Sequence, residues 1–275
     1  MSGAMRGIWF IGLLLHPALM RAQGLCLPPT SSNEAKTMAI LSVPVAFTAA
    51  RAPAMPLRSW SVGLDVATLP QVDPEVARPT FCRPGKGPEN TDPIPVVVRP
   101  RIAVALAGFV IEGAWTPPIT LGGVRANLFG FAVSRPVRLA DGVVLGVRAH
   151  AVFGGLNAPI TCDEAALEDS GSECFRGTLS DDRWNPGVRG IEAVVGLGSR
   201  IRPYAGVGMS WLRPRFQVDF TNSVGDRDQR RVEVDLERVA VMVGVTAPLA
   251  GVEVTAEGYA TVRDAMTARL VVRYR

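Results

Sequence analysis

The sequence predicts an all-β fold, a closed antiparallel up-and-down transmembrane β-barrel of about 10 strands, preceded by a short N-terminal helix or plug segment. Three observations predict it. Apolar residues recur with a period of two in many successive segments. Many of these segments approach the length of about 9–11 residues that a tilted strand needs to cross a bilayer. The connections between them alternate between long and short, as in membrane barrels.

The predicted strands are long compared with the usual soluble strand of about 5–6 residues. A count of eight strands is also compatible with the pattern. With 28 Gly and 22 Pro in 275 residues, the composition fits a turn-rich β chain better than a helical one. The expected strands lie near residues 59–69, 97–107, 109–116, 124–135, 143–154, 189–199, 203–219, 231–246, 251–262 and 265–274.

One face of these strands carries Gly, Ala, Ser and Thr with isolated ionisable residues, which indicates the barrel interior. A narrow barrel needs small residues inside and tolerates charges there when they pair. We therefore expect the interior arginines to pair with interior carboxylates. The residues assigned to the lumen are Asp65, Arg101, Glu112, Arg148, His150, Glu192, Glu253, Glu257, Arg269 and Arg273.

The opposite, apolar face should contact lipid. A two-sheet sandwich would also alternate, but its water-facing side usually carries Lys, Thr, Gln and Glu rather than this much Gly and Ala. An arginine is expected to be tolerated at Gly155, near a loop, but not at the bilayer midplane. The residues expected to face lipid include Leu145, Val147, Ala149, Ala151, Val254 and Leu270.

The connections assign the two ends of the barrel. Those at residues 70–95, 117–123, 155–187 and 221–230 are long or of medium length, and those at 107–108, 140–142, 200–202 and 248–251 are short, as is the ninth near 263–264. Short connections are periplasmic in membrane barrels. With an exported N-terminus and an even strand count, both termini are expected at the short-turn end.

The chain divides into three parts. Residues 1–23 have the layout of a secretory signal peptide, with Arg6 before an apolar run that is too short to span a membrane. Residues 24–58 form an N-terminal linker or plug segment, in which a helix over 34–41 is expected to be capped near Ser32 and ended by Pro44. Whether this segment stays in the periplasm or enters the lumen is open. Residues 59–275 form the barrel.

Two local patterns carry a family resemblance. Residues 203–209 read Pro-Tyr-Ala-Gly-Val-Gly-Met, and the last strand alternates up to the aromatic Tyr274, with Arg275 one residue beyond. Over roughly 59–275 the sequence resembles small bacterial outer-membrane β-barrel proteins of the OmpA/OmpW-like superfamily. The resemblance implies a place in the bacterial outer membrane, with outer-membrane lipid and the barrel-assembly machinery as partners.

Four cysteines in an exported chain indicate disulfides. Cys162 and Cys174 bracket eleven residues of acidic loop, and Cys26 and Cys82 remain as the other possible pair, which the sequence leaves open. Zinc is the alternative, but no Cys-x-x-Cys spacing occurs and no histidine lies near either cysteine of the loop.

Trp60, Trp115, Trp211 and Tyr274, together with Trp184, suit the two membrane–water interfaces, where amphipathic rings gather. A platform for substrate is the alternative interpretation of this set.

No catalytic, cofactor-binding or metal-binding residue is assigned. Outside the leader the only histidine is His150, and a hydrogen bond to a lumen carboxylate explains it more simply than catalysis. The net charge of +4 is too small and too evenly spread to indicate a nucleic-acid partner.

The expected function is therefore a non-enzymatic outer-membrane barrel with a structural, binding or small-solute transport role and a filled, ion-paired interior. Two alternatives stay open. One is a soluble exported lipocalin-like or β-sandwich protein that binds a small apolar ligand. The other is an outer-membrane hydrolase. The sequence does not identify a solute or ligand.

Overall fold

The computed structural model describes residues 24–55, 60–91, 94–198 and 200–274, so the predicted signal peptide at 1–23 lies outside the described residues. Within these ranges no helix has the length and apolar character needed to cross a membrane. The elements are β1 (Leu25–Cys26), α1 (Asn33–Val45), β2 (Trp60–Thr68), α2 (Pro74–Ala77), β3 (Val96–Leu106), β4 (Phe109–Thr116), β5 (Thr120–Leu121), β6 (Val124–Ala140), β7 (Val143–Ala158), α3 (Glu164–Glu168), β8 (Asp182–Asn185), β9 (Val188–Leu197), β10 (Arg202–Leu212), β11 (Arg215–Gln217), β12 (Phe220–Thr221), β13 (Arg227–Asp228), β14 (Arg231–Glu233), β15 (Leu236–Leu249), β16 (Val252–Thr261) and β17 (Ala265–Tyr274).

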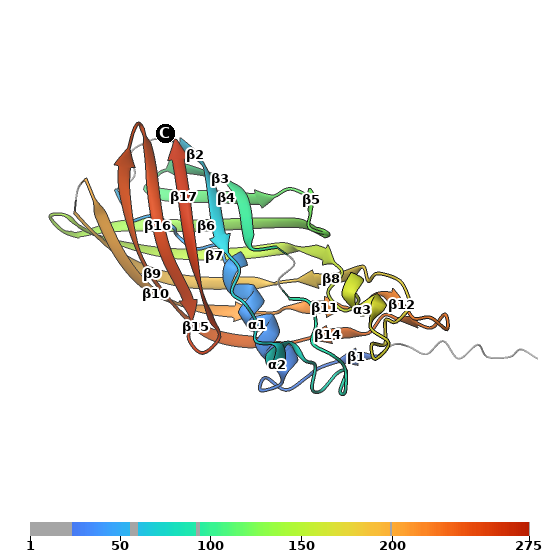
Figure 1. The fold of residues 1–275 in the computed structure, drawn as a ribbon. Helices are drawn as coiled ribbons and strands as arrows, with labels where there is room; N and C mark the ends of the chain where they lie inside the picture. Colours follow the sequence, from blue (N-terminus) through green and yellow to red (C-terminus); the bar gives the residue numbers. More distant parts are fainter. Residues whose placement is uncertain (1–23, 56–59, 92–93, 199, 275) are drawn as a thin grey trace, which may run out of the picture.

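Ten long strands form a closed antiparallel barrel in the order β2, β3, β4, β6, β7, β9, β10, β15, β16 and β17 (Figure 1). The last strand closes the ring because β17 pairs with β2, with Tyr274 opposite Val62 and Arg269 opposite Ala67. Closure pairs each of these ten strands on both sides, so the ring itself presents no free edge. The predicted fold class and strand number are confirmed.

The observed strands differ from the expected ones at both ends of the barrel. The segments expected over 203–219 and 231–246 are each interrupted, the first at residues 213–214 and the second at 234–235. Pro214 cannot donate a backbone hydrogen bond, which accounts for the first interruption. Strands β6 and β7 have 17 and 16 residues and extend beyond the predicted ends.

Four tight turns, after β3, β6, β9 and β15, lie together at one end, which we call the turn end, whereas the short turn between β16 and β17 lies at the opposite end. In two of them both central residues have positive φ: Ala107 and Gly108 at 50° and 81°, and Ala250 and Gly251 at 48° and 84°. This geometry matches the right-handed twist of the flanking strands, and glycine adopts it without strain.

The long connections lie at the opposite end, which we call the mouth and define as residues 25–45, 69–95, 117–123, 159–187 and 213–235. Here the short strands β8, β11 and β14 continue the wall beyond one side of the ring, and β1 adds in parallel to β14 (Figure 1). Tyr274 lies at the turn end, whereas Leu25 lies at the mouth. The expectation that both termini lie at the short-turn end is therefore wrong for the start of the described chain.

The reason is that the N-terminal segment passes through the barrel before β2 begins. Ser32 caps α1, its Oγ accepting from the N–H of Ala35 at 3.2 Å. The helix is longer than expected, because Pro44 lies inside its last turn. Arg269 of β17 donates to the carbonyls of Val43 and Pro44 there, at 3.1 and 2.8 Å, and a cation stabilises a helix C-terminus.

From Ala46 to Ala54 the chain continues through the interior without regular structure. We call these residues the lumen segment. Its residue Phe47 is fully buried.

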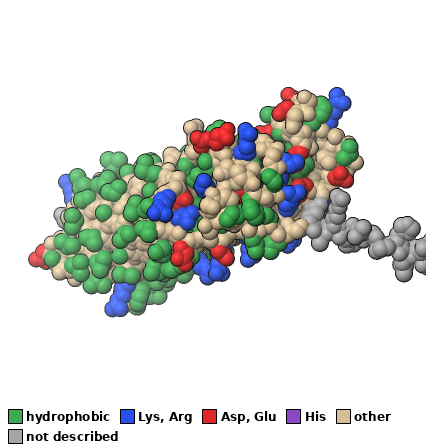
Figure 2. All heavy atoms as spheres, turned by 90° about the horizontal axis from the view of Figure 1, so that it is seen from below, with side chains coloured by type: hydrophobic (Ala, Val, Ile, Leu, Met, Phe, Trp, Pro, Cys, Tyr) green, Lys and Arg blue, Asp and Glu red, His purple; other side chains and the backbone are tan. Residues whose placement is uncertain are grey.

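The outer wall is apolar. Figure 2 shows hydrophobic side chains covering the barrel towards the turn end, whereas charged side chains gather towards the mouth. Val147 and Leu270 are 53% and 49% exposed there. Leu145, Ala149, Ala151 and Val254 have the same outward facing, in alternation with buried neighbours.

Candidate functional site: the barrel interior and its mouth

The ten ionisable residues expected in the lumen are all buried, with exposures between 0% and 7%. Asp65 of β2 is the most connected of them. Its Oδ2 lies 2.8 Å from Arg99 Nε, 3.4 Å from Arg101 Nη1 and 3.6 Å from Arg269 Nη1. One carboxylate therefore serves three guanidinium groups from two neighbouring strands.

The other interior carboxylates also face cations across adjacent strands. Glu112 accepts from Arg101 at 2.8 Å, and Glu192 accepts from Arg148 at 3.0 Å. Glu253 lies 4.0 Å from Arg273 and also contacts Arg202, and Glu257 lies 3.9 Å from Arg269. Such pairing offsets part of the cost of removing the charges from water.

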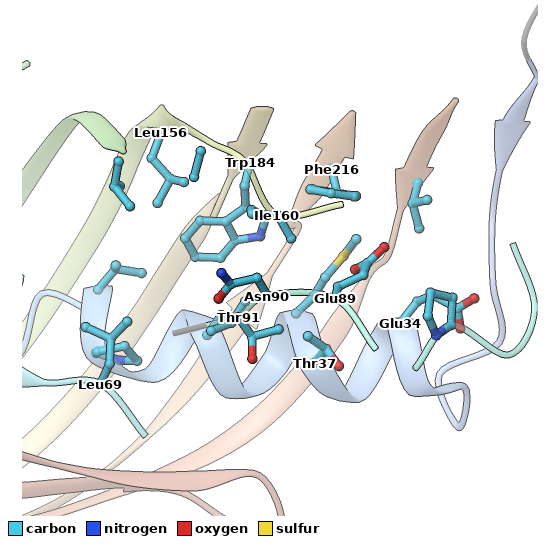
Figure 3. A pocket seen from close by; sticks show the side chains of 18 of the residues that line it. Glu34, Thr37, Leu69, Glu89, Asn90, Thr91, Leu156, Ile160, Trp184 and Phe216 are labelled. Atoms are coloured by element: carbon cyan, nitrogen blue, oxygen red, sulfur yellow. The ribbon is translucent and has the colours of Figure 1, made fainter. Parts of the chain in front are cut away.

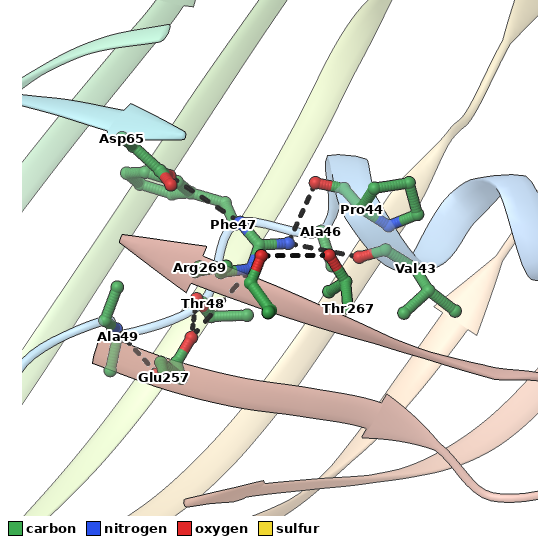
Figure 4. Close-up of polar contacts among 12 residues, drawn as sticks. Val43, Pro44, Ala46, Phe47, Thr48, Ala49, Asp65, Glu257, Thr267 and Arg269 are labelled. Atoms are coloured by element: carbon green, nitrogen blue, oxygen red, sulfur yellow. Dashed lines mark hydrogen bonds and ion pairs between the residues drawn. The ribbon is translucent and has the colours of Figure 1, made fainter. Parts of the chain in front are cut away.

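These arginines have a second set of partners that sequence reasoning missed, namely the carbonyls of the N-terminal segment. Arg99 donates to Val45 and Ala46, each at 2.9 Å, and Arg101 donates to Thr48 at 2.8 Å. Arg148 donates to the carbonyl of Phe47. Arg273 donates to that of Ala49 at 3.4 Å, and Figure 4 shows Arg269 on Val43 and Pro44.

The N–H groups of the lumen segment are held in the same way. Glu257 accepts from the N–H of Ala50 at 3.0 Å and from the hydroxyls of Thr48 and Tyr204. Thr246 accepts from the N–H of Ala52 at 3.0 Å. An irregular chain inside a barrel has no sheet partner, so the wall must satisfy its backbone.

Phe47 fixes the position of the lumen segment. The guanidinium groups of Arg99, Arg101 and Arg148 lie 5.4, 4.4 and 5.0 Å from the centre of its ring, which is cation–π geometry. A Cβ on Gly130 would lie 2.9 Å from the ring, so a side chain at this position of the wall would displace it. Arg99 could have been found from its period-two relation to Arg101, but nothing in the sequence pattern indicates Phe47.

Little free space remains inside the ring. A cavity of about 40 Å³ lies beside Arg51 and Pro53 towards the turn end. The His150 side chain is fully buried, and its Nε2 lies 3.3 Å from Glu192. Among the described residues no group of His, Cys, Asp and Glu has the arrangement of a metal site. The interior is thus arranged to hold a chain segment in place.

The expected loop disulfide Cys162–Cys174 is confirmed, and the pairing left open by the sequence, Cys26–Cys82, is also formed; both disulfides lie at the mouth. Cys26–Cys82 joins the start of the N-terminal segment to the connection between β2 and β3. Glu34 of α1 binds the same connection, accepting from the N–H groups of Thr80, Phe81 and Cys82 at 3.1, 2.8 and 2.7 Å. Burial alone would raise the pKa of Glu34, but these three N–H groups hold it below its ordinary value.

Between α1 and the inner face of the extended wall lies a cavity of about 90 Å³, which we call the mouth cavity (Figure 3). Met38 and Leu41 of α1 form one side, and Leu156, Trp184 and Phe216 form the other. A few polar side chains from the connection between β2 and β3 reach it, among them Glu89, Asn90 and Thr91.

The aromatic residues expected at the interfaces divide between the two ends of the wall. Trp60 and Tyr274, at the turn end, are 56% and 59% exposed, and Trp115 and Trp211, at the mouth end of their strands, are 45% and 36% exposed. Trp184 does not belong to this set, because it is 3% exposed and faces the mouth cavity. Its position on the short strand β8 of the mouth puts it outside the alternation of the main wall.

No protein-family model and no curated protein matches this chain. Similar solved structures include Neisserial surface protein A, at 13% identity over 78% of this chain and 96% of that chain, with a TM-score of 0.27. The outer membrane protease OmpT from Escherichia coli is similar at 11% identity over 78% and 93% of the two chains, with a TM-score of 0.39. The closed ring of ten strands, apolar outside and charged inside, is the architecture of a small outer-membrane β-barrel protein.

Proposed function

We propose that this protein is a non-enzymatic barrel of the bacterial outer membrane that does not conduct solutes and acts through its mouth, in a binding or structural role. The observation that carries the proposal is how the wall holds the end of α1 and the lumen segment that follows it. Arginines from three strands of the wall, β3, β7 and β17, donate to consecutive carbonyls of residues 43–49. A solute would have to break these contacts to pass.

The placement in the membrane is part of the proposal. Residues 1–23 direct export, the barrel-assembly machinery inserts the chain, and lipid surrounds the apolar wall. Trp60 and Tyr274 lie at one membrane–water interface and Trp115 and Trp211 at the other. The exposed apolar wall argues against a soluble lipocalin-like or sandwich protein, since a large contiguous apolar surface is rare on soluble monomers.

The proposal that the protein is not an enzyme rests on its histidine. The His150 side chain is fully buried beside Glu192, and the surface pocket at Arg189 and Trp211 borders the residue without exposing its ring, so a substrate cannot contact the imidazole unless the wall shifts. A general base must come within hydrogen-bond reach of the proton that it takes.

The test is conductance of the purified full chain in planar lipid bilayers. The native chain is expected to give no steady current steps. A variant in which Phe47 and Thr48 are both replaced by Gly loosens the lumen segment and should give intermittent steps, with the heat-dependent gel shift of a folded barrel showing that it has folded. Steady channels from the native chain would reject the closed interior.

Orientation is tested with an epitope tag in the loop at Ser170 or in the turn at Asp141 on intact cells. The loop tag is expected to bind antibody at the cell surface, and the turn tag is not. The reverse result would place the mouth in the periplasm.

A further inference from the structure

We propose that the mouth cavity binds one uncharged, single-chain amphiphile, an alkyl chain with a hydrogen-bond-accepting head group such as an alcohol or ester. This inference deepens the binding role proposed above. Protein interiors are close-packed and contain few voids larger than a water molecule. A cavity of about 90 Å³ is several times what one water requires, roughly 10–15 Å³.

The lining indicates an apolar occupant. Most of the residues around the cavity are aliphatic or aromatic, and they come from α1, from the wall and from the connection between β2 and β3. Along the aliphatic part of the lining, water lacks the polar partners that hold buried waters elsewhere. An alkyl chain would instead gain apolar contacts on both sides, and burial of apolar surface is favourable.

The shape favours a chain over a compact ring system. The cavity follows α1 from Glu34 to Val45, and a helix rises about 1.5 Å per residue, so this side spans roughly 17 Å. Figure 3 shows the lining side chains spread along the helix rather than gathered around one point. A long, narrow space of small volume fits a single extended chain.

One polar atom indicates where the head group binds. The indole N–H of Trp184 has no hydrogen-bond partner among the described residues, although the residue is 3% exposed and lines the cavity. By contrast, the indole N–H of Trp115 donates to Asn127 at 3.0 Å. A buried donor without a partner is costly, and an oxygen of a ligand would satisfy it.

The charges around the cavity select against an anionic head group. Glu34 and Glu89 both line it, and the guanidinium group of Arg83 is already bound by Glu89 and Glu173. A carboxylate on the ligand would be repelled by the two glutamates without gaining a free cation. The site therefore suits an alcohol, ester or amide oxygen.

The experiment uses the full chain, folded and held in an amphipathic polymer without detergent. In the parent of this series, every tryptophan other than Trp184 is replaced by Phe. The probe is decanol carrying bromine on its chain, because bromine quenches indole fluorescence on contact. Quenching should saturate and be reversed by excess unlabelled decanol. Decanoate at pH 8 should bind at least tenfold more weakly.

Cavity-filling variants distinguish binding of decanol in the mouth cavity from its nonspecific association with the apolar outer wall. Ala158→Phe places a ring in the cavity and should weaken binding at least tenfold. Val124→Phe is a second variant of the same kind, should the first fail to give the gel shift of a folded barrel. Ala149→Phe, on the outward face of the same strand β7, is the matched control and should leave binding unchanged.

The hydrogen bond is tested by calorimetry with decanol on the otherwise native chain. Trp184→Phe should weaken binding roughly threefold to tenfold, the range of a single net hydrogen bond. Quenching that never saturates, or that is equal in Ala158→Phe and its parent, would overturn the site. Equal affinity of Trp184→Phe and the native chain would overturn the assignment of the head group. Neither result bears on conductance, so failure of the closed-barrel proposal is seen separately.

Discussion

The barrel interior and the mouth cavity both face parts of one N-terminal segment, the lumen segment and α1. The wall presents charged side chains to the first and apolar side chains to the second. The lumen segment has no regular structure, so its carbonyls and N–H groups need partners from the wall, and arginines and Glu257 supply them. Helix α1 satisfies most of its own backbone, so the wall that faces it carries Leu156 and Phe216 and leaves a space. The secondary structure of the segment thus decides whether the facing wall is charged or apolar.

The largest effect is expected from breaking the charged side of this comparison at Asp65. Asp65→Ala removes the carboxylate that three buried arginines share, and loss of one member of a buried ion pair costs about 3–5 kcal/mol. Unfolding by urea in lipid vesicles measures the change. The control is Asp235→Ala, which removes an ion pair with Arg213 whose side chains are 77% and 59% exposed, and it should cost under about 0.5 kcal/mol. Equal costs would mean that the interior network adds nothing.

Removing each disulfide in turn tests how much it stabilises the mouth and the start of the N-terminal segment. The disulfides close loops with sequence separations of 56 and 12 residues, which the chain-entropy model values at about 4 and about 3 kcal/mol. Replacing Cys26 and Cys82 by Ser should therefore destabilise more than replacing Cys162 and Cys174. It should also expose the start of α1 to protease, which the second pair of substitutions should not do. Cleavage rates beside urea midpoints check both statements, and the opposite order would contradict them.

The next prediction compares an arginine placed on the apolar outer face of the barrel with one placed at the mouth. Val147→Arg puts a guanidinium on the apolar face of β7 and should cost about 2–4 kcal/mol in refolding into vesicles, because hydrocarbon does not solvate the charge. Gly155, expected from the sequence to tolerate an arginine, gives a less clean comparison, since a Cβ there would lie 2.2 Å from Oδ1 of Asn185 and would add a local clash to the effect of the charge. Leu121, 62% exposed on β5 at the mouth, replaces it, and Leu121→Arg should cost about 0–1 kcal/mol. Equal losses of folding free energy in the two variants would mean that Val147 does not face the hydrocarbon of the membrane.

The last prediction concerns pH at the mouth cavity. Burial raises the pKa of Glu89 from 4.5 to about 7, against the opposing effect of Arg83 and with Asp182 and Glu34 adding to the rise. Between these pH values the folded chain keeps a proton that the unfolded chain has lost. Stability should therefore fall as the pH rises from about 4.5 to about 7. Glu89→Gln should flatten this part of the profile of urea midpoints, and an unchanged slope would assign it to another group.

The period-two pattern was sufficient to predict the ring of ten strands, the facing of the lumen residues and most strand ends, because alternation is a local property of each strand. The loop disulfide could be predicted for a similar reason, as Cys162 and Cys174 lie twelve residues apart. Pairing of arginines with carboxylates followed from the cost of an unpaired charge.

Only the tertiary structure decided the path of the N-terminal segment and what it covers. Arg269 binds the carbonyl of Val43 across 226 residues of sequence, and no periodicity of either segment encodes that contact. The sequence left both a periplasmic linker and a lumen plug open, and it placed Trp184 with the interfacial aromatic residues. The burial of Trp184 and the space beside it depend on how α1 packs against the extended wall, which is a property of the assembled chain.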